Sequence, residues 1–181
     1  MQTIAFESKR LFSGLAGFGT YCRTLISDFA KYYPQNHYVL FAHEPSKVLG
    51  EQPTYGSPEI QRIVNLDSVD IVFPPDRGRL YWKLLGAKRE LLSHQVDLYH
   101  GLTHQIPRSI RRAGIPKIVS IHDLIYRHFP KLFPGENLDA HDRELRKACA
   151  VSDRIVAVSE STKRDLIHFF SINPEKISVI Y

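Results

Sequence analysis

The stretch KIVSIHDL, residues 117–124, is a short apolar run that ends in two adjacent polar side chains, His122 and Asp123. Its composition, rich in Val and Ile, is typical of a buried β-strand. Six further runs of similar length and composition predict strands elsewhere in the chain, at 3–7, 37–44, 60–66, 96–102, 154–160 and 176–181. Several of these runs are separated by stretches with apolar residues at helical spacing, so strands and helices alternate.

This alternation predicts an α/β fold. We expect a Rossmann-like, three-layer domain in which helices cover both faces of a mostly parallel sheet of about seven strands. The chain has 181 residues, of which 43% are hydrophobic and 24% charged, a balance that suits one domain over 1–181. Ligands of an open parallel sheet bind beyond the carboxyl ends of its strands. The candidate binding loops are therefore 8–19, 101–107, 122–134 and 159–162.

Composition and charge exclude several classes of protein. The net charge is +5, and its basic residues form no stripe interleaved with aromatics, so we expect no nucleic-acid partner. No apolar stretch is long enough to cross a membrane and the first residues do not form a signal peptide, which predicts a cytoplasmic protein. Cys22 and Cys149 lie far apart in helical patterns and are expected to be buried thiols.

The sequence GLAGFG, residues 14–19, places glycines where a helix is predicted to begin. Glycines permit close backbone approach, and a helix start offers N–H groups to a phosphate or carboxylate. The order is G-x-x-G-x-G, however, the reverse of the G-x-G-x-x-G found in dinucleotide-binding domains, and no Walker A lysine follows. Gly17 and Gly19 are candidate binding residues, and the alternative is that they only turn the chain.

His122 and Asp123 are neighbours on a strand, so their side chains point to opposite faces and are not expected to form a relay with each other. His122 is suited to hydrogen-bond a sugar hydroxyl or stabilise charge there, and Asp123 to hold the loop that follows. A purely structural histidine is the alternative. In the sequence AVSES, Ser159 predicts a helix N-cap with Glu160 in the first turn, whose N–H groups could also face a ligand.

Two other segments contain residues typical of a metal site or a membrane contact. His100 and His104 are four residues apart, but they lie on a strand end and a loop and lack the glutamate of a zinc-binding helix, so no metal site is expected. In the predicted helix at 79–92, Trp82 lies near Lys83 and Arg89 on the outer side. This arrangement suits peripheral contact with a membrane, and an ordinary solvated face is the alternative.

Together these segments resemble the N-terminal domain of the family-4 retaining glycosyltransferases of GT-B architecture. The similarity rests on segments in the family's order that cover nearly the whole chain: SGLAGFGTYCRTL (13–25), VDLYHGL (96–102), IVSIHDLIYRHFP (118–130), SDRIVAVSESTKRDLI (152–167) and INPEKISVIY (172–181). The resemblance implies transfer of a sugar from a nucleotide-sugar to the hydroxyl of a glycan or lipid-linked acceptor. It also implies retention of anomeric configuration and no metal or other cofactor, the nucleotide-sugar being a substrate.

By position, the resemblance implies that His122 contacts the transferred sugar and is the catalytic candidate. Gly17 and Gly19 would approach the donor phosphate or the acceptor, and Ser159 with Glu160 would line the cleft floor. Asp123 joins them as a substrate-binding candidate. The family has a second, C-terminal domain that binds the donor, and no such segment occurs here. We therefore expect a protein fragment that is inactive alone and completed by that domain.

Two alternatives stay open at this point. A sugar-nucleotide epimerase of similar two-domain architecture would also need a second domain. A standalone binding domain without catalysis would not. The resemblance favours the transferase, active in glycan or polysaccharide synthesis, in the cytoplasm or at the inner face of the membrane.

Overall fold

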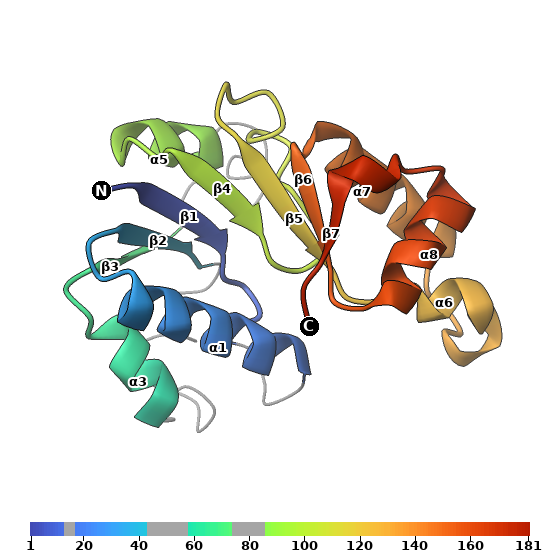
Figure 1. Cartoon of the computed structure of the whole chain (residues 1–181), viewed down its shortest axis with the longest axis horizontal. Coiled ribbons are helices and arrows are strands. Elements are labelled where there is room, and N and C mark those ends of the chain that lie inside the picture. Colours follow the sequence, from blue (N-terminus) through green and yellow to red (C-terminus); the bar gives the residue numbers. More distant parts are fainter. Residues whose placement is uncertain (13–16, 43–57, 74–85) are drawn as a thin grey trace. The chain divides into compact units, whose positions relative to one another are not determined.

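The computed structural model of the chain describes residues 1–12, 17–42, 58–73 and 86–181, in which strands and helices alternate (Figure 1). The described residues form two compact units, Met1–His100 with Pro107–Ile115 and Gly101–Ile106 with Pro116–Tyr181. The prediction of a single domain over 1–181 stays a prediction.

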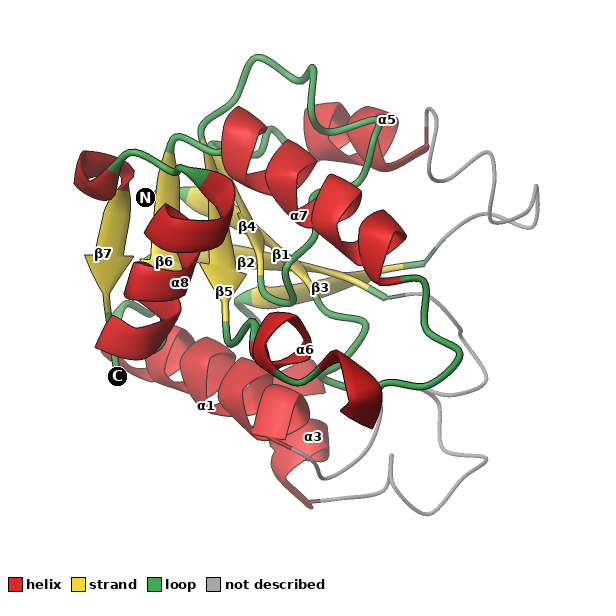
Figure 2. Ribbon diagram, turned by 90° about the vertical axis from the view of Figure 1, so that its right-hand side faces the viewer, coloured by secondary structure: helices red, strands yellow, loops and turns green. Residues whose placement is uncertain are grey.

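The first unit is built on parallel strands in the order β3-β2-β1-β4. Helices α1 and α3 lie on one face of these strands and α5 lies on the other (Figures 1 and 2). Large apolar and aromatic side chains, including Phe6, Tyr38 and Tyr99, are fully buried between these layers. The elements are β1 (Thr3–Glu7), α1 (Gly17–Tyr32), β2 (His37–Phe41), α3 (Pro58–Val64), β3 (Val69–Val72), α5 (Ala87–Ser93) and β4 (Leu98–Gly101).

One predicted strand is wrong. Residues 60–66 were expected to be extended, but most of them belong to helix α3, and the strand β3 follows at Val69–Val72. Ile60 and Ile63 are the buried residues of α3 and are three positions apart, a spacing that places both on one face of a helix. Pro58 suits the first turn of a helix, because a proline there costs no intrahelical hydrogen bond.

The second unit contains parallel strands in the order β5-β6-β7. Helix α7 packs against β5, and α8 packs against β6 and β7. Both helices lie on the same side of these strands in Figures 1 and 2. The elements are β5 (Lys117–Ile121), α6 (Ile125–His128), η2 (Pro130–Leu132), α7 (Leu138–Val151), β6 (Arg154–Ala157), α8 (Glu160–Phe170), η3 (Pro174–Lys176) and β7 (Ile177–Val179).

The predicted α/β, Rossmann-like class is confirmed, with seven parallel strands and their helices among the described residues. The first half of the predicted helix at 79–92, residues 79–85 with Trp82 and Lys83, lies outside the described residues, and the second half corresponds to α5. In the part of the chain that the structure describes, no helix is both long and apolar enough to span a membrane.

Candidate functional site

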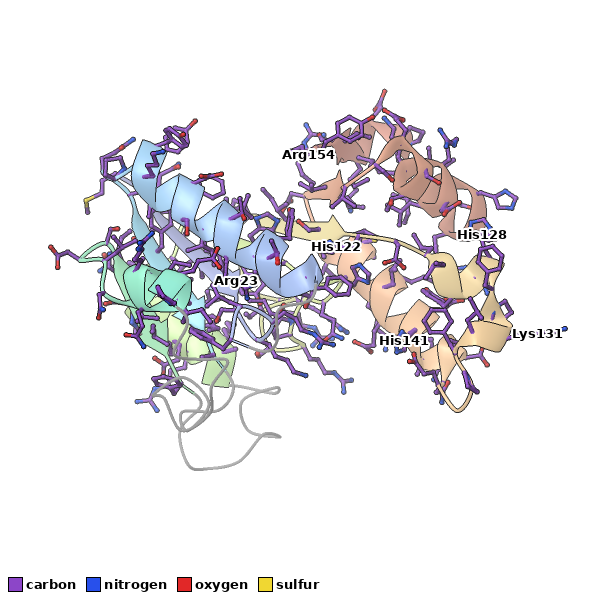
Figure 3. The ribbon with its side chains drawn as sticks, turned by 90° about the horizontal axis from the view of Figure 1, so that it is seen from below. Arg23, His122, His128, Lys131, His141 and Arg154 are labelled. Carbon is purple, nitrogen blue, oxygen red and sulfur yellow. The ribbon has the colours of Figure 1, made fainter. Side chains whose placement is uncertain are left out.

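His122 follows the last residue of β5 and is held through both its backbone and its ring. Its backbone N–H donates to Nε2 of His104 at 2.8 Å, and its own Nε2 lies 2.8 Å from the carbonyl oxygen of Leu102. A carbonyl only accepts, so the proton of the His122 ring is on Nε2. Figure 3 labels His122 where the chain leaves β5 toward α6, which carries His128.

Both rings of this histidine pair are uncharged at neutral pH. Burial lowers the pKa of His104 from 6.5 to about 3, and the nearby His122 and His141 act in the same direction. Burial also lowers the pKa of His122, against the opposing effects of its hydrogen bond to Leu102 and of the Asp123 charge. The ring centroids of His104 and His122 are 5.4 Å apart, a separation at which two positive charges would repel.

The start of α8 is hydrogen-bonded to His122 as well. Ser159 is the N-cap predicted from sequence, and its Oγ accepts the backbone N–H of Thr162 at 3.1 Å. The buried Thr162 in turn donates its hydroxyl to the carbonyl oxygen of His122 at 2.8 Å. Glu160 lies exposed in the first turn of this helix. The helix cap and the end of β5 are therefore one hydrogen-bonded assembly.

Asp123 is exposed and holds the loop that follows, as the sequence predicted. Its Oδ1 accepts the backbone N–H of Ile125, the first residue of α6, at 3.1 Å. Beyond it, Asp142 of α7 accepts a hydrogen bond from the Tyr126 hydroxyl at 2.8 Å and pairs with Arg127 at 3.1 Å. His122 and Asp123 thus have separate bonding partners, and α6 is tied to α7.

The loop that places His104 next to His122 has an unusual backbone conformation. Gly101 permits its tight path, because a Cβ at this position would collide with the carbonyl oxygen of Gln105. His104 itself has φ 63°, a left-handed conformation that is uncommon for a residue other than glycine. These two positions fix where the His104 ring can point.

Gly17 and Gly19 belong to the first unit. Both lie in the first turn of α1, where Gly17 is exposed and Gly19 is buried. Among the described residues, no atom lies within 4 Å of a Cβ added at Gly17, so their packing does not require glycine there. The preceding residues 13–16, which include Gly14 of the predicted motif, lie outside the described residues.

His100 and His104, the two histidines at metal-ligand spacing, have different surroundings. His100 is buried with its ring 5.8 Å from that of Phe6, whereas His104 is bonded to His122. Within the described ranges, no group of three or more His, Cys, Asp and Glu side chains could hold a metal ion. Cys22 and Cys149 are buried thiols, as predicted.

The sequence missed the partners that position His122. From the sequence, His104 has no expected role, since no metal site is predicted there, and no pattern links Thr162 or the carbonyl of Leu102 to His122. The one available signal was that all three lie in loops predicted to follow strand ends. The ligand-binding roles of Gly17, Gly19, His122, Asp123, Ser159 and Glu160 stay predictions.

Comparison with known proteins identifies the family. A search of curated proteins found no match. The family model described as Glycosyltransferase Family 4 matches residues 16–181, a span that includes the histidine pair and the start of α8. This chain therefore belongs to Glycosyltransferase Family 4.

Proposed function

We propose that this chain is the acceptor-side domain of a retaining glycosyltransferase, which moves a sugar from a nucleotide-sugar to an acceptor hydroxyl. The observation that carries the proposal is the neutral His122, fixed at the end of β5 by His104 and Leu102. In parallel α/β folds this is the edge at which ligands bind. A fixed polar group there can orient a sugar without bringing a formal charge to it.

The other candidates take supporting roles in this proposal. The start of α8, capped by Ser159 and carrying Glu160, lines the floor of the acceptor site. Asp123 contributes to substrate binding while it holds the start of α6. Gly17 and Gly19, in the first turn of α1, approach the donor phosphate or the acceptor. Helix N-termini suit such groups because their backbone N–H groups point outward.

The proposed partners follow from the same reaction. The donor is a nucleotide-sugar that is consumed as a substrate, the acceptor is a glycan or a lipid-linked glycan, and the reaction needs no metal or other cofactor. A second domain that binds the nucleotide completes the GT-B enzyme. We place the reaction in glycan or polysaccharide synthesis, in the cytoplasm or at the inner face of the membrane, with no nucleic acid involved.

Sugar transfer by the full-length protein tests this function. Nucleotide-sugars of different base and sugar are incubated with glycan and lipid-linked acceptors, and the anomeric configuration of each product is determined by NMR. We expect a product with the donor's configuration, and turnover that falls at least tenfold in His122→Ala, as is common when a positioned group is lost. His168→Ala, on the exposed surface of α8, is the matched control. Unchanged turnover in His122→Ala would rule out the role of this residue.

Two further measurements test whether the reaction needs a metal and whether the protein contacts a membrane. Activity that persists after exhaustive EDTA treatment is expected for a reaction without a metal. A loss of activity that is reversed by added Mg²⁺ or Mn²⁺ would contradict this expectation.

Membrane contact predicts salt-sensitive co-sedimentation with anionic vesicles. The exposed Lys88 and Arg89 of α5 would contribute to the attraction. Equal recovery with neutral and anionic vesicles would contradict contact of this kind.

A further inference from the structure

The bond between His104 and His122 replaces a regular hydrogen bond of the sheet. The backbone N–H of His104 donates to the carbonyl oxygen of Ser120 at 3.1 Å. In a regular parallel ladder, a residue that donates to position 120 accepts the N–H of position 122 through its own carbonyl. Here the ring of His104 accepts that N–H instead, with 2.8 Å between the two nitrogens. A side chain therefore stands in for a backbone carbonyl at the end of β5.

The backbone conformation of His104 accounts for this substitution. With φ 63°, the residue departs from extended geometry and does not continue the strand. A strand-terminal N–H that loses its acceptor is costly when it is shielded from water. The imidazole supplies the missing acceptor, and it can do so only with Nε2 unprotonated and the proton on Nδ1. Burial of the ring favours this neutral form.

The remaining contacts of His122 complete its fixation. Thr162 donates to its carbonyl oxygen at 2.8 Å, and the ring donates through Nε2 to Leu102 at 2.8 Å. The peptide groups on both sides of His122 and the ring itself are thus all hydrogen-bonded. The peptide plane preceding His122 is held at two atoms: His104 accepts the N–H of His122, and the backbone N–H of Val158 donates to the carbonyl oxygen of Ile121 at 3.2 Å.

We propose that His104 is a positioning residue for sugar transfer, because its imidazole replaces a backbone carbonyl and, together with the ladder bond from Val158 to Ile121, fixes the peptide plane that sets the direction of the His122 ring. The proposal rests on the proposed function of His122. It assigns His104 no contact with the substrate. A side chain whose acceptor atom can reach the N–H of His122 should be able to take over this role, whereas an apolar side chain should not.

NMR tests the geometry independently of any activity. In the uniformly ¹⁵N-labelled chain at pH 7, long-range ¹H–¹⁵N spectra report which ring nitrogen of each histidine is protonated. We expect the proton of His104 on Nδ1, that of His122 on Nε2, and a scalar coupling between the amide nitrogen of His122 and Nε2 of His104. Finding the proton of His104 on Nε2 would overturn the proposal, because that nitrogen could then not accept.

Kinetics test the consequence in the full-length transferase. His104→Gly removes the ring and relieves the positive φ, whereas His104→Gln keeps an acceptor that can reach the same N–H. We expect kcat of His104→Gly to fall about tenfold or more, since small misplacements of an active group are costly. The KM for the nucleotide-sugar should change less than about twofold. His104→Gln should recover most of the lost kcat, which a merely structural loss would not explain.

The control is Ser171→Gly, which relieves a positive φ of 54° at the C-cap of α8 and should leave kcat unchanged. Wild-type kcat in His104→Gly, or equal loss in the Gly and Gln variants at equal thermal stability, would overturn the proposal. A wild-type protein that transfers no sugar would instead refute the proposed function. The NMR result would then still decide whether the ring of His104 holds His122.

Discussion

The hydroxyl of Tyr126 donates a hydrogen bond to Asp142, with 2.8 Å between Oη and Oδ1, and so joins α6 to α7. The same carboxylate pairs with Arg127, whose guanidinium lies 5.2 Å from the ring centroid of Phe169 on α8. Within the second unit, the short α6 is therefore fixed to both longer helices by polar and aromatic contacts. The loop that begins at Asp123 leads directly into this anchored helix.

Removing the hydroxyl alone should weaken this anchor. For Tyr126→Phe we expect the free energy of unfolding to fall by about 1–2 kcal/mol, because the buried phenol loses a hydrogen bond to a charged group. Urea unfolding followed by circular dichroism measures the change. Tyr32→Phe, at a ring that is 63% exposed, is the control and should be neutral within about 0.5 kcal/mol. Equal stability of Tyr126→Phe and wild type would contradict the proposed anchor.

Loss of the α8 cap should destabilise that helix. Ser159→Ala leaves the N–H of Thr162 without its side-chain acceptor, and we expect a loss of about 1 kcal/mol, the usual cost of removing an N-cap. Ser159→Asp should retain most of the stability, because a carboxylate can accept the same bond and favours a helix N-terminus. Ser161→Ala is the control on the same turn. An Ala variant as stable as the Asp variant would show that the cap contributes nothing.

A side chain at position 101 should not be tolerated. Gly101→Ala places a Cβ against the carbonyl oxygen of Gln105, and we expect a cost of about 1–3 kcal/mol as the loop shifts. Gly114→Ala is the matched control, because no atom of the described ranges lies within 4 Å of its added Cβ. Thermal unfolding of both variants measures the difference. Similar unfolding temperatures for the two variants would mean that the loop at 101 accommodates a Cβ without strain.

The histidine pair predicts a specific dependence of stability on pH. The pKa of His104 is about 3 in the folded protein and about 6.5 when unfolded, so only the unfolded chain takes up its proton between these values. The free energy of unfolding should therefore fall as pH is lowered from 6.5 toward 3, by up to about 1.4 kcal/mol per pH unit from this group.

The contribution of His104 is isolated by comparison with His104→Gln, which cannot titrate. The stability difference between wild type and this variant should shift in favour of the variant as pH falls through that range. His168→Gln, at an exposed histidine of α8, is measured in parallel as the control for losing an imidazole. Parallel pH curves for wild type and His104→Gln would contradict a depressed pKa at this position.

Local signals predicted much of this fold, and the failures have identifiable causes. The run at 117–121 is apolar enough to predict β5, and Ser159 predicts its cap because a capping bond spans only three residues. A run as short as 60–66 with Ile60 and Ile63 is compatible with a strand or a helix, so the spacing of its apolar residues does not distinguish the two. Strand β3 has only four residues, interrupted by an exposed Asp70, and gave no clear signal.

The site was less predictable because its contacts are distant in sequence. The bond between His104 and His122 joins positions 18 residues apart, and that between Thr162 and His122 spans 40. Neither bond has a local pattern. The role of His104 depends further on a positive φ, which no motif around a histidine specifies. Sequence could therefore select the loops but could not assign partners within them.

The segment Gly101–Ile106 belongs to the second unit, although the residues before and after it belong to the first. A fragment cut to begin at Pro116 would contain every residue of β5, β6 and β7 and would still lack both Leu102 and His104. Its His122 would keep the bond from Thr162 and lose those to His104 and Leu102. The smallest excisable piece that preserves this histidine must be a two-segment one, with 101–106 supplied in trans or joined by a new linker.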